Sequence, residues 1–157
     1  MSRGVLPAVV WLGGPEVGIA SWRVMPQYPF KPLYLAIPSW YLEAASPGEP
    51  PGMLDTLQIG PERCNTVAMP LLAFQIHLPA DIRETWERTA GPSGGADCPD
   101  LRRDRVHDVL ARALRSHAEC VLPVVAPGQD MTIGVRFPAG PRRPLYMAIV
   151  GVASAWR

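Results

Sequence analysis

Short apolar segments with a period of two dominate the hydrophobic pattern of this chain. Residues 71–78 (LLAFQIHL) place Phe74 and Ile76 on one face and His77 on the other, and residues 131–137 (MTIGVRF) alternate in the same way. Strict alternation of this kind is typical of a strand with one face in a core. The pattern therefore predicts strands over both segments.

Other strand-like segments are short and bounded by proline or glycine. They cover residues 5–12, 17–24, 33–37, 54–59, 121–125 and 145–153. The last of them (LYMAIVGVA) is apolar on both faces, so it needs a cover on both sides, from another sheet or another subunit. Pro7 lies inside the first, which indicates an edge strand or an extended arm.

One segment has a helical period instead. Residues 100–118 place Val106, Leu110 and Leu114 at helical spacing, with arginines and aspartates on the other side. The glycine-rich stretch 91–95 supplies a loop before it. The sequence thus predicts one amphipathic helix inserted between strands.

Together these segments predict a mainly β fold, a β-sandwich or jelly roll with one inserted amphipathic α-helix. We expect a single domain over residues 1–157, with residues 1–16 as an extended N-terminal arm and residues 91–119 as a loop and helix insertion. A parallel α/β fold is disfavoured, because one helix cannot supply its crossovers.

Composition narrows the possible partners. The net charge is +1 and 18% of residues are charged, which offers no broad phosphate-neutralising surface, so we expect no nucleic acid partner. No apolar stretch is long enough for a membrane span. The three cysteines (Cys64, Cys98 and Cys120) form an odd set without a C-x-x-C motif, which indicates reduced thiols. Proline is unusually frequent, at 19 of 157 residues, and is spread through the chain at strand ends and turns.

Candidate catalytic and metal-binding residues are few. His77 has no partner nearby in the sequence, and a strand position explains it. Cys98, His107, His117 and Cys120 could suit zinc. However, ten residues at about 100° each place His117 at a rotation of about 280° around the helix axis from His107, so the two do not share a face. We therefore expect no enzyme, no cofactor and no metal, with a small metalloenzyme using these four residues as a third alternative.

The tryptophans support a different alternative. Exposed aromatic rings can stack on sugars, which would make the chain a carbohydrate-binding module at a fibre or cell surface, whereas buried rings serve as core or interface anchors. The tryptophans are Trp11, Trp22, Trp40, Trp86 and Trp156.

Three stretches resemble one group of proteins. They are YPFKPLYLAIPS at residues 28–39, LDTLQIGPERC at residues 54–64, and PVVAPGQDMTIGVRFPAGPRRPLYMAIVGVA at residues 123–153. The first two are similar to the opening, and the third to the closing hairpin, of small tailed-phage and phage-like structural proteins. The stretches cover about a third of the chain. The resemblance implies a β-sandwich that forms or decorates a particle shell.

The leading hypothesis is accordingly a non-enzymatic virion protein, a capsid decoration, cementing or minor coat component assembled in the host cytoplasm. Its expected partners are copies of itself, as a homo-oligomer, or other capsid subunits. The apolar arm and ring-bearing residues are the expected contacts, namely Val9, Val10, Trp11, Trp40, Tyr41 and Trp156. On this hypothesis, deletion of residues 1–16 weakens assembly and leaves the isolated fold intact.

Overall fold

The computed structural model describes residues 3–17, 19–24, 29–43, 52–64, 67–90, 105–120, 122–136 and 143–156. The strands in this part of the chain are β1 (Arg3–Val17), β2 (Ile19–Val24), β3 (Phe30–Pro38), β4 (Met53–Ile59), β5 (Glu62–Arg63), β6 (Met69–Pro70), β7 (Gln75–Ile76), β8 (Met131–Arg136) and β9 (Arg143–Trp156). The α-helices are α1 (Arg83–Ala90) and α2 (Arg105–Ala113). The 3-10 turns are η1 (Ser39–Tyr41), η2 (Leu71–Phe74), η3 (Ala80–Ile82) and η4 (Leu114–Ser116). The protein is mainly β, as the sequence predicts.

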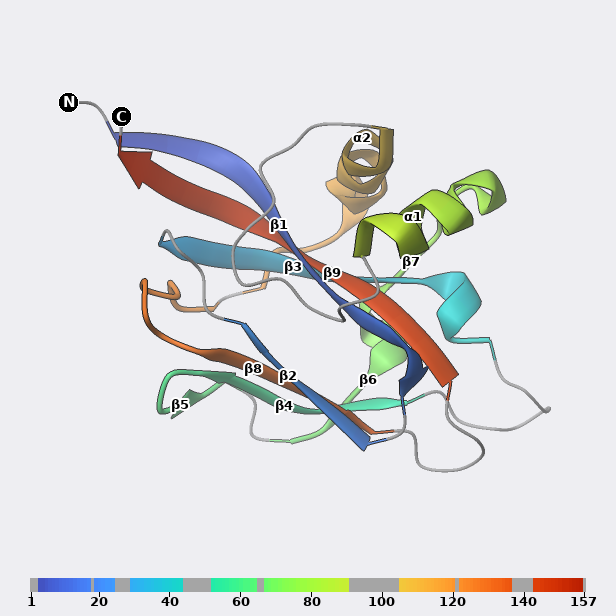
Figure 1. Cartoon of the computed structure of the whole chain (residues 1–157), viewed down its shortest axis with the longest axis horizontal. Helices are drawn as coiled ribbons and strands as arrows, with labels where there is room; N and C mark the ends of the chain where they lie inside the picture. The colour runs from blue at the N-terminus through green and yellow to red at the C-terminus, as the bar shows by residue number, and fades with distance from the viewer. Residues whose placement is uncertain are drawn as a thin grey trace.

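The strands form two sheets that lie in separate layers, with both α-helices on the outer side of the first (Figure 1). The first sheet has the strand order β1-β9-β3-β7, and the second has the order β2-β8-β4-β5, with β6 also paired to β4. Most pairs are antiparallel, and β3 with β7 is a short parallel pair.

In each sheet, two strands that are far apart in the sequence pair with each other. β1 pairs with β9 from Arg3↔Trp156 to Val17↔Arg143, and β2 pairs with β8 from Ile19↔Arg136 to Val24↔Met131. β3 and β4 then add to the other sides of β9 and β8. The C-terminal strands are therefore central in both sheets, with the N-terminal strands at one edge.

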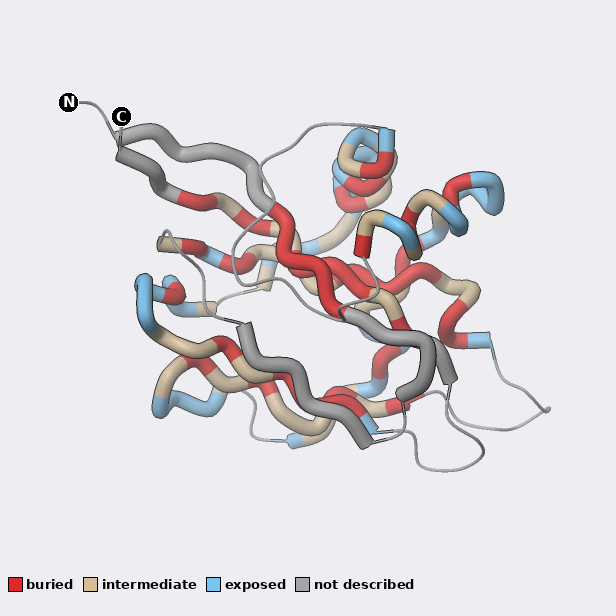
Figure 2. Tube along the Cα trace, in the orientation of Figure 1, coloured by how far each residue is buried: buried red, intermediate tan, exposed pale blue. Residues whose placement is uncertain are grey.

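β9 is covered on both faces, as its sequence requires. Ile149 lies in register with Leu35 of β3 and faces the second sheet, while Ala148 lies in register with Trp11 and faces the helices. All of these except the half-buried Leu35 are less than 4% exposed. The second sheet and the helices supply the two covers, and Figure 2 shows buried residues following β9 and β1 between these layers.

An aromatic cluster fixes the helices on the first sheet. The rings of Trp11 and Trp86 meet edge to face at 4.9 Å between centroids, and His107 of α2 lies 5.7 Å from Trp11. The Trp86 indole Nε1 donates a 2.9 Å hydrogen bond to the carbonyl oxygen of Tyr146 in β9. The cluster thus connects β1 to both helices, and the Trp86 hydrogen bond connects α1 to β9.

The helical prediction was correct in part. α2 and η4 fall inside the predicted range 100–118, with Val106, Leu110 and Leu114 buried at helical spacing. The prediction of one helix was wrong, because α1 was missed. Its buried residues Trp86 and Ala90 repeat at the same i, i+4 interval and could have indicated a helix.

The strand predicted over residues 71–78 was wrong. Residues 71–74 form the 3-10 turn η2, and only Gln75–Ile76 pair with a neighbouring strand. Met69–Pro70 pair with β4 in one sheet, and Gln75–Ile76 pair with β3 in the other. The chain must cross between layers here, so the turn replaces the alternating strand. The strand predicted over residues 121–125 is also reduced, to a single bridge between Val125 and Phe30.

The predicted N-terminal arm is a strand of the molecule itself. Pro7 does lie in an edge strand, which was one of the two alternatives, but β1 pairs with β9 along its length. Residues 9–12 are at most 4% exposed. The expected cover from neighbouring subunits is therefore wrong for residues 9–12, which the same chain covers.

Gly151 permits the close approach of β3 to β9. A Cβ atom at this position would lie 2.0 Å from the carbonyl oxygen of Lys31 and 3.0 Å from the Phe30 ring. Since the paired backbone cannot yield without disturbing the register, we expect Gly151→Ala to lower the free energy of unfolding by about 1–3 kcal/mol in urea denaturation. Alanine otherwise suits a strand interior better than glycine. A variant more stable than the wild type would contradict the close approach.

Candidate functional site

Most of the residues predicted to contact neighbouring subunits are buried inside the chain's own core. Val9, Val10, Trp11 and Tyr41 have exposed fractions of 4%, 0%, 3% and 4%. They cannot reach a neighbour in this fold, because the second sheet and the helices already cover them. Trp40 is half-buried, and the side chain of Trp156 lies outside the described part of the molecule.

The tryptophans form no sugar-stacking platform among the described residues. Trp11 and Trp86 pack on each other in the core at 3% and 0% exposure. Trp40 lies beside the Arg83 guanidinium, whose central carbon is 5.9 Å from the Trp40 ring and 5.7 Å from the Tyr41 ring. The side chains of Trp22 and Trp156 are outside the described residues. The described rings thus anchor the helices and η1.

The histidines and cysteines with possible chemical roles are dispersed. His77 is exposed, with Nε2 3.4 Å from the Gln75 side-chain amide, and His107 packs on Trp11. Nε2 of His117 lies 3.2 Å from the Gln75 carbonyl oxygen, and Cys98 is outside the described residues. No group of three or more His, Cys, Asp or Glu side chains that could hold a metal occurs in the described part of the chain.

Polar contacts hold the helical layer together. The Tyr41 hydroxyl donates a 3.0 Å hydrogen bond to Glu87 of α1, and burial, with that carboxylate nearby, raises the pKa of Tyr41 far above its usual range. An Arg105–Asp81 ion pair of 2.6 Å joins α2 to η3, and the hydrogen bond from Arg105 lowers the pKa of Asp81. These groups therefore bind one another.

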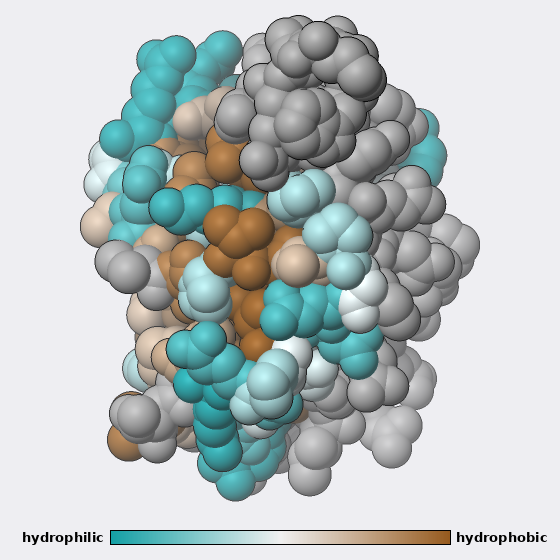
Figure 3. Space-filling model, turned by 90° about the vertical axis from the view of Figure 1, so that its left-hand side faces the viewer, coloured by the Kyte–Doolittle hydropathy of each residue, from teal (hydrophilic) through white to brown (hydrophobic). Residues whose placement is uncertain are grey.

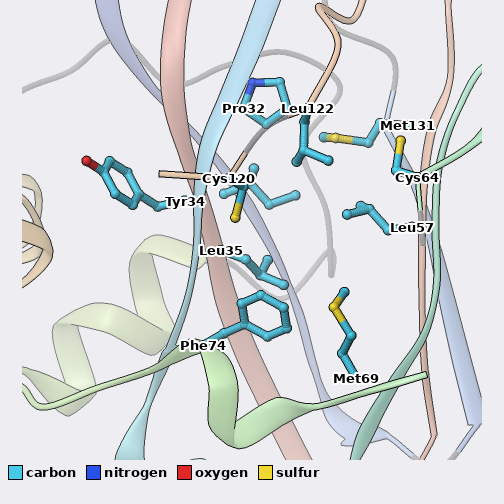
Figure 4. Close-up of a pocket in the computed structure, with 11 residues that line it drawn as sticks. Pro32, Tyr34, Leu35, Leu57, Cys64, Met69, Phe74, Cys120, Leu122 and Met131 are labelled. Atoms are coloured by element: carbon cyan, nitrogen blue, oxygen red, sulfur yellow. The ribbon is translucent and has the colours of Figure 1, made fainter. Parts of the chain in front are cut away.

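A cavity of about 200 Å3 lies between the two sheets (Figure 4). Its walls come from both sheets, from η2 and from the segment around residue 120, and they are almost entirely apolar. The lining residues are Pro32, Tyr34, Leu35, Leu57, Cys64, Met69, Phe74, Cys120, Leu122, Met131 and Ile149. A largely apolar hollow in the core of a small domain is the typical form of a small-molecule site.

Two of the three thiols of the chain line this cavity. Burial raises the pKa of the Cys120 thiol, and burial, with Glu62 nearby, raises the pKa of the Cys64 thiol. A raised pKa keeps both groups mainly protonated at neutral pH, so they pack as small apolar side chains and react slowly as nucleophiles. Both are free cysteines.

A smaller recess of about 90 Å3 adjoins the cavity. The two share Tyr34, Leu35, Phe74 and Cys120, and the recess extends toward His117 after α2. Figure 4 shows the Tyr34 hydroxyl pointing away from the other lining side chains, and this hydroxyl lies 3.5 Å from the Glu119 carboxylate. The polar atom of Tyr34 is therefore outside the cavity.

The β1 edge of the first sheet, which pairs only with β9 among the described residues, is the second feature of interest. The amide of Phe30 donates to the carbonyl of Val125 at 3.0 Å, and the Val125 amide donates back at 2.7 Å, so the Phe30 backbone faces away from β9. The backbone N–H and C=O of Ala153, which lies opposite Phe30, must then point the other way and pair with Leu6 of β1. Because these directions alternate, the backbones of Arg3, Val5 and Pro7 face outward from the sheet. Those of Val9 and Trp11 also face outward, but both residues are at most 4% exposed.

The side of the molecule on which β5 lies has a strip of apolar side chains among polar ones (Figure 3).

In the described residues, no helix is both long and apolar enough to cross a membrane. No known protein family, curated protein or solved structure matches the chain.

Proposed function

We propose that this protein is a non-enzymatic structural protein that associates with copies of itself through the edge strand β1. The observation that carries the proposal is the position of β1, a 15-residue strand that pairs only with β9 among the described residues. An edge strand presents unpaired amide and carbonyl groups that a second strand can bind. Two copies related by a two-fold axis would join their first sheets into one continuous sheet.

The setting we propose is a particle shell, with the protein as a capsid decoration, cementing or minor coat component of a virion. The two β layers, which we propose form a sandwich or jelly roll, and the resemblance of residues 28–39, 54–64 and 123–153 to phage structural proteins support this setting. The contact surface differs from the one expected from the sequence, since backbone groups of β1 replace its buried side chains. Trp40, which is half-buried, remains a candidate side-chain contact.

Pro7 limits the length of strand available for pairing. Its backbone faces outward and lacks an N–H group, so the edge has no donor at that position. The outward donors N-terminal to Pro7 are the amides of Arg3 and Val5, and the inward ones are those of Gly4 and Leu6. Residues 9–12 are at most 4% exposed and Pro15 lacks an N–H group, so we place the centre of the contact in residues 3–6.

Amide hydrogen exchange measured by NMR at increasing protein concentration tests this surface. We expect exchange at the outward amides of Arg3 and Val5 to slow by at least about tenfold as the protein associates, which corresponds to about 1.4 kcal/mol of added protection. The inward amides of Gly4 and Leu6 are the matched control, because β9 protects them at every concentration. The native mass from light scattering is recorded in parallel.

Two outcomes would contradict the proposal. Outward amides that exchange rapidly at every concentration, with a monomeric mass, would show that the edge has no partner. Outward amides that are already protected in a monomer would show that the chain covers its own edge.

A further inference from the structure

The cavity between the sheets has a lining suited to one class of ligand. Apart from two thiols and the Tyr34 ring, whose hydroxyl points away, the described residues that line it present only hydrocarbon and thioether side chains. None of these described lining residues is charged. A charged or strongly polar molecule would lose its hydration there without gaining a partner, whereas an apolar molecule would gain contacts with every wall.

The size of the cavity defines the ligand further. A dry apolar cavity of about 150 Å3 is enough to take up benzene. The present cavity, at about 200 Å3, is larger and adjoins a recess of about 90 Å3. Scaling from benzene gives a molecule of roughly eight non-hydrogen atoms in the main cavity, such as a substituted six-membered ring.

The walls can adjust to such a molecule. Met69 and Met131 are flexible, polarizable side chains, and thioethers make favourable contacts with aromatic rings. One wall is the segment that carries Cys120 and Leu122, which has no regular secondary structure. The Cys120 amide holds this segment against β3 by a 2.7 Å bond to the Leu33 carbonyl. Tyr34, Leu35 and Leu122 are only half-buried, so the cavity is partly open to solvent at this wall and a ligand can enter there.

We infer that this cavity binds a small uncharged apolar ring compound between the two sheets. The site is separate from the β1 edge, because its described lining residues include none from β1. Ligand binding and self-association can therefore succeed or fail independently.

Titration of the whole protein with fluorobenzene, followed by fluorine NMR, tests the inference. We expect saturable binding to the wild type. Leu122→Phe, which fills the cavity from its irregular wall, is expected to weaken binding at least about tenfold. Val124→Phe is the matched control, because Val124 is 50% exposed, does not line the cavity and lies two residues away. Its affinity should stay within about twofold of the wild type.

The charged analogue 4-fluorobenzoate has the same ring and tests the exclusion of charge. We expect it to bind at least about tenfold more weakly than fluorobenzene. Equal binding of the two compounds, no saturable binding of fluorobenzene to the wild type, or unchanged binding to a folded Leu122→Phe variant would each overturn the inference.

Alkylation of the cavity thiols gives a readout that needs no substitution. Iodoacetamide labelling of Cys64 and Cys120, resolved by peptide mass spectrometry, should slow at least about threefold when the wild type is saturated with fluorobenzene. Unchanged labelling of both thiols would reject the cavity as the binding site.

Leu122→Ala supplies a second variant that enlarges the cavity. It should bind 1-fluoronaphthalene more tightly than the wild type does.

Discussion

Deletion of residues 1–16 is expected to abolish the folded state. The deletion removes nearly all of β1 and with it the side chains of Val9, Val10, Trp11 and Leu12, all at most 4% exposed. Burial of one such side chain stabilises a fold by about 1.5–3 kcal/mol, so four contribute roughly 6–12 kcal/mol. That range is comparable with the whole stability of a typical domain, about 5–15 kcal/mol. The intact fold expected from the sequence alone would therefore be lost.

Circular dichroism and the dispersion of the NMR spectrum would measure this loss. A synthetic peptide of residues 1–17 added to the truncated chain is the control, because it can supply β1 in trans and should restore the native spectrum. A truncated chain that keeps a native spectrum and unfolds cooperatively would refute the structural role of β1 and would revive the N-terminal arm.

The substitution Trp86→Ala should lower the stability of the fold more than Gly151→Ala does. Trp86 is fully buried, its ring packs edge to face on Trp11 at 4.9 Å, and its indole donates to the Tyr146 carbonyl at 2.9 Å. Removal of a buried tryptophan costs about 3–5 kcal/mol. The orphaned carbonyl adds to that cost. We expect α1 to detach from the first sheet, and urea denaturation would measure the fall in the free energy of unfolding.

Glu84→Ala on the same helix is the matched control. The Glu84 side chain is 90% exposed and pairs only loosely with Arg88, at 3.5 Å. An exposed i, i+4 pair contributes about 0.3–0.5 kcal/mol, so this variant should stay close to the wild type. If the two variants differed by less than about 1 kcal/mol, Trp86 would not be the anchor of the helical layer.

Sequence periodicity identified the central strands well. β8 alternates as predicted, with Met131, Ile133 and Val135 all buried, and the apolar run of β9 has a cover on each face. The apolar side chains of both strands are buried by neighbouring elements of the fold. Periodicity failed at residues 71–78, because an alternating pattern carries no information that the chain must pass there from one sheet to the other.

The sequence could not reveal the cavity or the identity of the covering surfaces. The cavity residues come from both sheets and from segments between Pro32 and Ile149, with no local motif. The apolar residues 9–12 were predicted to contact neighbouring subunits, and only the pairing with residues 147–150 shows that their cover is internal. Long-range pairing of this kind leaves no trace in local composition or spacing.

The pairing of β1 with β9 and of β2 with β8 has a consequence for synthesis. Each of these contacts joins positions more than 100 residues apart, so the ribosome must make most of the chain before either pair can form. Until then the apolar β1 segment has no strand to pair with. A chain with such distant pairings folds slowly. During translation, this segment is where a chaperone would find its binding site.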